Sequence, residues 1–543
     1  MKTPAEAPSP TRASSQPAPT ESPLQRYLPL LLWFLVIVTL LAIPMRIIGY
    51  GYLPGGDARR HVAKAFTDKP YNQILLLRSE YSMDHSPGWE WLLKVLHQKA
   101  GWNLDALVTF SVVGLMLCVF YAPLPWLRRP EAWLAALLAQ MLAIPELMTR
   151  LTQARPLLIT EGILIAILFA WSKPSPKNPS WLKLTLTCLG ISLSVWMHGA
   201  WYLWVLPLAA FFLARSWRKA LWLTACFVAG ILAGALFTGK PIEFLRQALL
   251  IVAAISREHL PQWMLVGELR PSYGEFETLL LLAVVVIWRK LQSIYPAGNT
   301  AASVSLSPRE RAGVRGNTIP YNQESTDTSG NENQNHQQPD LLRQPIFWLI
   351  LICWILGFKA DRFWADWGVP AVLVWLTLQF EDLMPTLWDA ASPKRLMVCG
   401  LLAMPLFLHT TNDLDRRYTF NLNENFLNAS DPSLQGWLPE GKGIFYSAQM
   451  GFFYNTFYQN PQAEWRYIVG LEPALMPEED RQIFRQIQWN NYAFKAYEPW
   501  INKMLSADRL MLEHPVQPNL PQLEWHNALG NIWIGRLPKL KNP

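Results

Sequence analysis

Charged residues are scarce in this chain of 543 residues: 16% are Asp, Glu, Lys or Arg, while 51% are hydrophobic. The first fraction lies below the usual range of soluble globular proteins and the second lies above it. Polar side chains are almost absent from the runs 30–43, 163–171 and 279–288. A soluble protein would have to bury all such runs in one core, whereas a lipid bilayer accommodates them directly. We therefore predict an integral membrane protein.

The chain also lacks basic tracts and cysteine clusters. Its net charge is +7, yet no run of five or more Lys and Arg residues occurs, and many basic residues flank apolar runs. This placement is typical of membrane topology rather than of nucleic-acid binding, so we expect no nucleic acid among the partners. The five cysteines lie inside apolar runs without metal-ligand spacing, and we expect free thiols: Cys118, Cys188, Cys226, Cys353 and Cys399.

Hydropathy predicts a mainly α-helical, polytopic bundle of about eleven spans. They are expected near residues 27–48, 104–120, 132–144, 156–171, 182–197, 200–214, 221–237, 271–288, 346–358, 367–380 and 396–409. The last three have apolar cores shorter than the roughly 17 residues of a perpendicular crossing, so polar flanks must extend them or they are partly re-entrant.

Composition divides the rest of the chain. Residues 1–26 and 292–343 are rich in small and polar residues without apolar periodicity, which predicts a disordered tail and a disordered loop. The tail precedes a transmembrane module, 27–291, and the loop separates this module from further transmembrane helices, 344–411. The module includes a long first outer loop, 49–103. Residues 412–543 alternate turn signals with aromatic pieces, which predicts a compact mixed α/β domain with a helix near 478–487.

Loop charges predict the orientation. Basic clusters occur in alternate loops, and the positive-inside rule places these loops in the cytoplasm. The clusters are Arg128 and Arg129; Lys173, Lys177 and Lys183; Arg215, Arg218 and Lys219; Arg289 and Lys290; Lys394 and Arg395. The first loop and the C-terminal domain then lie outside. The absence of expected disulfides fits a bacterial inner membrane with the C-terminus outside.

The segment Leu53-Pro-Gly-Gly-Asp-Ala-Arg-Arg-His61, directly after the first span, is the most informative motif. Its two glycines permit a tight turn that would hold Asp57 just above the membrane. A carboxylate beside Arg59, Arg60 and His61 is able to accept a proton from an attacking hydroxyl. A turn aspartate in a solvated charged loop is the alternative interpretation.

Other ionisable groups gather at the same outer rim. Arg155, Arg270 and Arg362 lie near outer span ends, where a guanidinium either binds a phosphate or reaches lipid headgroups. His198 stands between two spans, and Asp84 and His85 form a second polar group in the first loop. Ser86 and Pro87 after them are equally suited to starting a helix. Farther along, Trp465 and Tyr467 are suited either to saccharide stacking or to core packing.

Short pieces of the chain resemble the GT-C glycosyltransferases, which include protein mannosyltransferases and aminoarabinose transferases. The pieces are Gly55-Gly56-Asp57 through His61, Gln153-Ala-Arg-Pro156, Trp196-Met-His-Gly199 and Asp361-Arg362-Phe363-Trp364. The resemblance implies a polytopic enzyme that takes a sugar from a polyprenyl-phosphate carrier and acts on the non-cytoplasmic face. Its partners would be a lipid-linked donor, a lipid, glycan or protein acceptor, and membrane lipids.

Carried over to this chain, the resemblance makes Asp57 the catalytic acidic residue. Arg155, Arg270, Arg362, His198, His61, Asp84 and His85 would bind the substrate or its phosphate. Many family members carry paired acidic residues in the first loop, whereas Ala58 and Arg59 follow Asp57 here. A divalent metal prefers several oxygen ligands, so a metal site stays open and no cofactor is assigned.

Two other classes fit part of the pattern. A transporter or flippase would place charges within the spans, where Glu161 is the clearest example. A non-catalytic receptor or scaffold would use the C-terminal domain alone and would need no role for Asp57.

Overall fold

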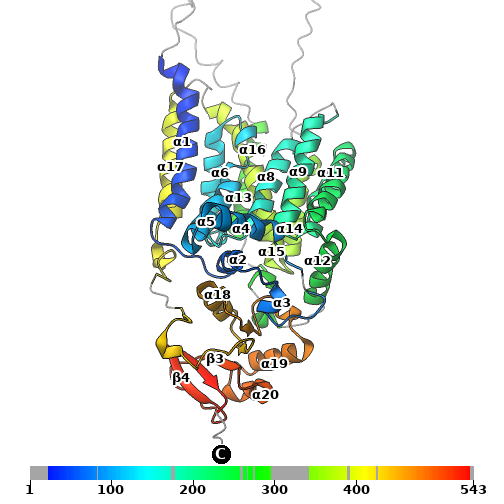
Figure 1. Cartoon of the computed structure of the whole chain (residues 1–543). Helices are drawn as coiled ribbons and strands as arrows, with labels where there is room; N and C mark the ends of the chain where they lie inside the picture. Colours follow the sequence, from blue (N-terminus) through cyan, green and yellow to red (C-terminus); the bar gives the residue numbers. More distant parts are fainter. Residues whose placement is uncertain are drawn as a thin grey trace, which may run out of the picture.

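The computed structural model describes residues 23–81, 83–172, 178–256, 261–265, 267–272, 276–294, 341–387, 392–422 and 426–538. Most of residues 1–26 and 292–343, for which we predict disorder, therefore lies outside the described part. Within that part the chain is mainly helical, with one small sheet near the C-terminus (Figure 1).

A helix occupies each segment for which we predict a span. These helices are α1 (Pro23–Ile48), α5 (Leu104–Tyr121), α6 (Pro130–Ala143), α8 (Leu157–Ser172), α9 (Trp181–Met197), α10 (Val205–Leu213), α11 (Trp217–Leu236), α13 (Phe276–Ile294), α14 (Pro345–Gly357), α16 (Val369–Leu387) and α17 (Lys394–Thr411). Among the described residues, three stretches are long and apolar enough to cross a membrane: Tyr27–Ile48, Leu104–Trp126 and Trp217–Leu236. Four shorter helical stretches are also apolar: Leu157–Ser172, Trp181–Met197, Trp201–Leu213 and Pro345–Gly357. The structure therefore indicates a membrane protein, and the number of crossings stays a prediction.

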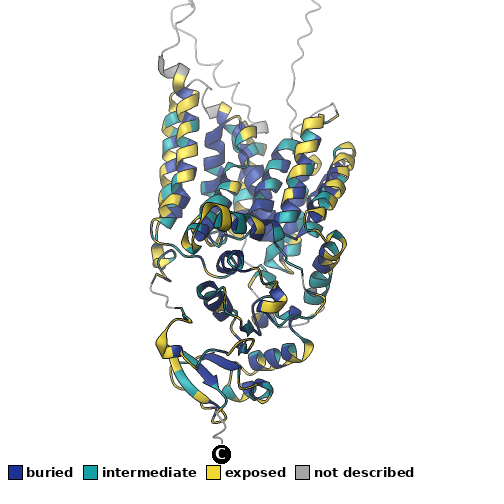
Figure 2. Cartoon of the chain, in the orientation of Figure 1, coloured by how far each residue is buried: buried dark blue, intermediate teal, exposed yellow. Residues whose placement is uncertain are grey.

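The outer helices are apolar on both sides, which a membrane explains. In α1, Leu32, Val36 and Leu40 are buried, while Leu30 and Phe34 on the other side are each 67% exposed. Figure 2 shows the same contrast, with exposed residues along α1 and α11 and buried residues in α6 and α8. Water would disfavour such an exposed apolar surface, whereas lipid chains accept it.

A close contact at a glycine and a buried ion pair both help to hold the bundle together. A Cβ atom on Gly234 of α11 would lie 2.5 Å from the Ser192 carbonyl of α9, so only glycine permits this close approach. Between α6 and α17, the Glu131 carboxylate accepts two hydrogen bonds from Arg395, at 2.7 and 3.0 Å. Both side chains are buried. Arg395, which we used as a marker of a cytoplasmic loop, is thus a structural partner inside the bundle.

The long first loop folds into short helices: α2 (Asp57–Ala65), α3 (Tyr71–Ile74) and α4 (Pro87–Ala100). The last begins at Pro87, with Ser86 as its N-cap, which confirms that this dipeptide starts a helix. A further helix, α12 (Pro241–Ser256), lies where the sequence suggested only a loop. Its polar residues, including Arg246 and Gln247, lower its hydropathy below that of a span.

The C-terminal region forms a mixed five-stranded sheet with the order β2-β1-β3-β5-β4. The strands are β1 (Ile444–Tyr446), β2 (Arg466–Tyr467), β3 (Arg509–Glu513), β4 (Glu524–Leu529) and β5 (Ile532–Arg536). Strands β2, β1 and β3 are parallel, and β5 pairs antiparallel with β3 and β4. Three helices, α18 (Met450–Gln459), α19 (Glu478–Trp489) and α20 (Glu498–Lys503), cover the sheet. A helix near residues 478–487 is therefore confirmed.

The first loop and the C-terminal sheet are joined through their main chains. Leu75 pairs in parallel with Tyr467 at the free edge of β2, and the Leu76 amide donates to the Tyr467 carbonyl at 2.9 Å. Farther along, the Arg78 amide donates to the Leu475 carbonyl at 3.1 Å. Helices α2 and α18 also pack together, so the loop and the domain lie at the same end of the bundle (Figure 1).

Candidate functional site

Asp57 is the first residue of α2, and a glycine turn places it there. Gly56 adopts a φ of 72°, which a residue with a Cβ atom disfavours, and it serves as the N-cap of the helix. The Asp57 carboxylate lies between two guanidinium groups: Oδ1 is 3.2 Å from Arg60 Nη2, and Oδ2 is 3.7 Å from Arg155 Nε. Arg155 also forms an ion pair with Glu268. The predicted turn is present, and Arg155 reaches Asp57 from the start of α8.

These arginines determine the charge state of Asp57. Burial alone would raise the pKa of its carboxyl group, but the positive charges of Arg60 and Arg155 lower it well below the ordinary value. Asp57 is therefore ionised at neutral pH. It offers a fixed negative charge at the junction between the bundle and the C-terminal domain.

Arg60 and His61 connect Asp57 to a buried network in the first loop. Arg60 donates to the Tyr71 hydroxyl at 3.0 Å, and that hydroxyl donates to Glu90 of α4 at 2.6 Å. His61 Nδ1 lies 3.2 Å from the same carboxylate, and its Nε2 lies 3.1 Å from Arg60. Burial and the charge of Arg60 lower the pKa of His61 to about 3. His61 is thus a neutral, enclosed residue whose two ring nitrogens already face partners.

Asp84 belongs to the same network. Its carboxylate accepts a hydrogen bond from the Ser86 amide at 2.9 Å, just before α4. Burial, followed by the negative charge of Glu90, raises its pKa well above the ordinary value. The structure places Asp84 beside the start of a helix, next to a second carboxyl group.

His85 and His198 come together from the first loop and the end of α9. Their ring centroids are 4.8 Å apart, in an edge-to-face arrangement. Gly199 follows and donates its amide to the His85 carbonyl at 2.9 Å; a Cβ atom there would lie 3.0 Å from the His85 ring. This contact explains why a glycine follows His198. Among the described residues, His198 Nδ1 is buried and has no hydrogen-bond partner.

Both histidines are neutral at pH 7. Burial and the positive charge of Arg362 lower the pKa of His85 to about 4. Burial and the neighbouring His85 lower the pKa of His198 well below its ordinary value. Neutral imidazoles are able to donate one hydrogen bond and to accept another.

Arg362 lies beside a second set of charges at the same end of the bundle. Its Nε is 3.4 Å from Asp366 Oδ2, within a π-helical turn, Trp364–Gly368. Arg150 of α7 (Leu147–Thr152) donates to Asp366 at 2.8 Å and forms an ion pair with Asp361. Arg362 also interacts electrostatically with Asp57 and with Glu472 of the C-terminal domain. Asp57, Arg155 and Arg362 therefore belong to one electrostatic cluster.

Arg270 is the exception among the predicted phosphate-binding residues. Its side chain is exposed, and its guanidinium donates to carbonyl groups of its own loop, Leu265 at 3.0 Å and Trp263 at 3.3 Å. Among the described residues, Arg270 forms no ion pair or hydrogen bond with Asp57. Proximity to a span end placed it in the candidate set, and the local turn directs it elsewhere.

The C-terminal domain contributes groups that the sequence did not indicate. Asn455 of α18 accepts a hydrogen bond from the buried Arg59 of α2. Tyr454, in the same helix, interacts electrostatically with Asp57 and Arg60. Nothing local in the sequence distinguishes Arg150 and Glu268 either, because only their long-range ion pairs place them in this cluster. By contrast, Trp465 and Tyr467 are buried in the sheet core, so the packing interpretation of these aromatics is correct.

The residues around Asp57 do not fit a divalent metal. Among the described residues, no group of three or more His, Cys, Asp or Glu side chains is arranged to hold a metal ion. Two guanidinium groups already face the Asp57 carboxylate, and their positive charge disfavours a cation there. No step is therefore assigned to a metal.

No family model and no curated protein matches the chain. Among solved structures, it is similar to an oligosaccharyltransferase of Archaeoglobus fulgidus, which was tethered to an acceptor peptide containing the NVT sequon. The identity is 11% and the TM-score is 0.45, over 91% of this chain and 70% of that one. A likeness of this size carries no argument on activity, so the GT-C resemblance remains an expectation from the sequence.

Proposed function

We propose that the chain is a membrane glycosyltransferase that moves a sugar from a polyprenyl-phosphate carrier to an acceptor on the non-cytoplasmic face. The observation that supports this most is the ionised Asp57 carboxylate held beside Arg60 and Arg155, with Arg362 in the same cluster. A carboxylate suits the acceptor hydroxyl, and guanidinium groups suit the phosphate that leaves. The proposed base and the proposed phosphate-binding groups thus lie at one end of the bundle.

In the proposed step, the acceptor oxygen attacks the anomeric carbon of the sugar. The bond from that carbon to the phosphate oxygen breaks, and its electron pair stays with the phosphate. The hydroxyl proton passes to Asp57. Arg155 and Arg362 stabilise the negative charge on the departing phosphate, because a guanidinium fork matches its oxygens.

Without the donor, the low pKa of Asp57 opposes this role, since a carboxylate with a strongly lowered pKa is a weak base. The donor resolves the conflict. A phosphate that binds Arg155 competes with Asp57 and Glu268 for the same guanidinium. Asp57 then loses part of its positive surroundings, its pKa rises, and it becomes a better proton acceptor. Donor binding would thus activate the base.

His85 and His198 are suited to positioning the sugar. Both are neutral, and the buried Nδ1 of His198 has no partner among the described residues. A sugar hydroxyl would satisfy that nitrogen, and a buried polar atom without a partner is costly. His61 and Asp84 are proposed to act through the first loop, because their contacts face Arg60 and Glu90.

The first test replaces the proposed base. Asp57→Asn is expected to lower transfer by about 10²- to 10⁴-fold, because the amide cannot accept the proton. Transfer is measured by mass spectrometry of envelope lipids and glycoproteins in cells that lack the native copy. Asp68→Asn is the matched control, since this carboxylate lies in the same loop but is largely exposed. An unchanged profile with Asp57→Asn, in a protein that remains folded, refutes the proposed chemistry.

A second test compares the contributions of Arg155 and Arg270 to donor binding. Arg155→Gln is expected to raise the KM for a polyprenyl-phosphate sugar by about 10- to 100-fold, because a charge-assisted hydrogen bond is lost. Arg270→Gln is expected to leave the KM unchanged, since its guanidinium binds its own loop. Equal effects of the two variants would show that the ion pair with Asp57 does not mark the donor site.

The two other classes predict different results. A transporter would concentrate isolated charges within the spans, yet Glu161 interacts electrostatically with Arg150, Arg155 and Asp366 of the cluster already described. A receptor would retain its binding after Asp57→Asn and would yield no product. A product that depends on Asp57 therefore distinguishes the enzyme from both alternatives.

A further inference from the structure

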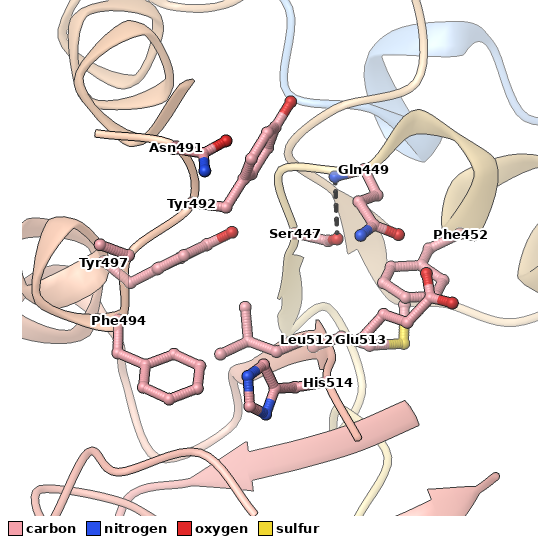
Figure 3. A pocket seen from close by; sticks show the side chains of 12 residues that line it. Ser447, Gln449, Phe452, Asn491, Tyr492, Phe494, Tyr497, Leu512, Glu513 and His514 are labelled. Carbon is pink, nitrogen blue, oxygen red and sulfur yellow. Dashed lines mark hydrogen bonds between the residues drawn. The ribbon is translucent and has the colours of Figure 1, made fainter. Parts of the chain in front are cut away.

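The C-terminal domain contains a cavity of about 450 Å³ that the Asp57 cluster does not use. Figure 3 shows Tyr492, Phe494 and Tyr497 on one side, and Ser447, Gln449 and Glu513 on the other. The first group follows α19, and the second follows or ends strands β1 and β3. The cavity thus opens between the sheet and the turn after α19.

The topology of the sheet produces this opening. From β1 the chain passes through α18 and adds β2 on one side; it then passes through α19 and α20 and adds β3 on the other side. Helix α18 packs with Phe445 and Met511, whereas α19 and α20 pack on the opposite face. The direction in which strands are added to the sheet therefore reverses between β1 and β3, although the two strands run parallel. In open α/β sheets, ligands bind at the carboxyl ends of the strands at such a reversal.

Residues that line the cavity come directly from these strand ends. Ser447 follows β1, Glu513 is the last residue of β3, and His514 comes next. His514 packs edge-on against Phe494, with ring centroids 4.8 Å apart. Its Nδ1 lies 2.8 Å from the Val516 carbonyl, so this contact involves only one of its two ring nitrogens.

The backbone holds an aromatic ring at the mouth of the cavity. Asn491 and Tyr492 have φ values of 49° and 58°, a conformation that non-glycine residues rarely adopt. Their amides donate to Gln488 and Ile487 at 2.9 Å, which closes the end of α19. Tyr492 is 42% exposed. An exposed tyrosine in a costly conformation offers a flat face to a ligand.

The chemistry of the lining selects the ligand class. None of the twelve lining residues is Lys or Arg, so the lining holds no permanent positive charge for a phosphate or a carboxylate, and the Glu513 carboxylate disfavours both. The lining instead combines four Phe and Tyr rings and the His514 imidazole with amide, hydroxyl and carboxylate groups. Aromatic faces pack against the C–H faces of a sugar ring, and amides and carboxylates hydrogen-bond its hydroxyls. We propose that this cavity binds a saccharide that carries no phosphate, either neutral or with an amino group.

The test measures binding, so its result does not depend on the proposed transferase activity. The full chain in lipid nanodiscs is titrated with mannose, glucose, N-acetylglucosamine, glucosamine and cellobiose at up to about 10 mM. Binding is followed by saturation-transfer NMR and calorimetry. Inorganic phosphate and a tetra-alanine peptide are the comparison ligands. At least one sugar is expected to bind, and phosphate is not.

Variants assign the binding to the cavity. Tyr492→Ala and Glu513→Gln are expected to weaken binding about tenfold each, while Tyr492→Phe keeps the ring and stays within about threefold. Leu505→Ala, an exposed site of the same domain outside the cavity, is expected to change nothing. The proposal is overturned if no sugar binds, if phosphate or the peptide binds there instead, or if folded Tyr492→Ala and Glu513→Gln bind sugar as the parent does.

Discussion

The fold raises the pKa of the Asp84 carboxyl group and so favours its protonated form. Burial and Glu90 raise its pKa, so between about pH 4 and this raised value the folded chain holds a proton that the unfolded chain has lost. Its contribution to stability is therefore full at low pH and is lost as pH rises through that window. Asp84→Asn imitates the protonated acid, so we expect the variant to melt higher than the parent at pH 8 and equally near pH 4. Melting temperatures in detergent measure this.

His61 and His85 titrate in the same range, but both are present in the parent and in the variant. Their contributions to the pH dependence of the melting temperature therefore cancel in the comparison. Asp68→Asn provides the control of opposite sign. Its hydrogen bond with Lys94 lowers the pKa of Asp68, so its removal should give no gain at pH 8. A difference between Asp84→Asn and the parent that is the same at both pH values contradicts the shift.

The arginines show where reasoning from the sequence stops at this scale. Arg155 and Arg270 were predicted alike, because both lie near outer ends of spans. Arg155 reaches Asp57, whereas Arg270 turns back onto the carbonyls of Trp263 and Leu265. Side-chain direction depends on the turn that carries the residue, and neither hydropathy nor spacing records it.

At the scale of elements, the ion pair between α6 and α17 should affect the free energy of unfolding most when only one of its two residues is replaced. Arg395→Leu leaves the Glu131 carboxylate buried without its bidentate partner, which should cost about 3–5 kcal/mol. The free energy of unfolding in mixed micelles measures this loss. Replacing both residues with Leu should cost much less, because no buried charge remains. Lys394→Leu, at an exposed neighbouring site, is the control.

The main-chain pairing between the first loop and β2 gives a second prediction. Leu76→Pro removes the amide that donates to the Tyr467 carbonyl, and Leu76→Ala keeps it. The proline variant alone should show faster hydrogen exchange in residues 71–81 and 465–470. Equal exchange in both variants would mean that side-chain packing, and not the main-chain contact, attaches the loop.

Elements were predicted unevenly, for physical reasons. Long apolar runs identified the helices, because lipid-facing and buried residues are both apolar. Strands of two or three residues, such as β1 and β2, are too short for a period of two to emerge. Helix α12 has a polar face, so a search for continuous hydropathy passed over it.

At the scale of the whole molecule, residue 57 and the C-terminal domain must be accessible from one side of the membrane. In a chain without its native cysteines, Gly55→Cys and Leu505→Cys should react with an impermeant maleimide from the same side. Asn178→Cys, before α9, should react only after permeabilisation. The structure places the first two sites at one end of the bundle. Labelling of positions 55 and 505 from opposite sides would exclude both the orientation and the proposed site.

The site as a whole was only partly predictable. The sequence made Asp57 and His85 candidates through polar motifs of the first loop, and it made Arg155, Arg362 and His198 candidates because polar residues near span ends are conspicuous against apolar runs. It missed the partners that reach them across the fold: Arg150, Glu268, Tyr454, Asn455 and Glu472. Residues 57 and 454 are distant in the chain, and nothing local in the sequence signals that they meet.

The pairing of Leu75 and Leu76 with Tyr467 also has a consequence for biosynthesis. A ribosome makes the loop strand nearly four hundred residues before its partner, with the intervening helices inserted in between. Until then the first loop has no β2 to pair with, and α2 lacks its contact with α18. A nascent or prematurely terminated chain could carry every proposed catalytic side chain of the first loop and still lack an assembled centre. The first loop can therefore pair with β2 only after the chain has been made as far as the C-terminal domain.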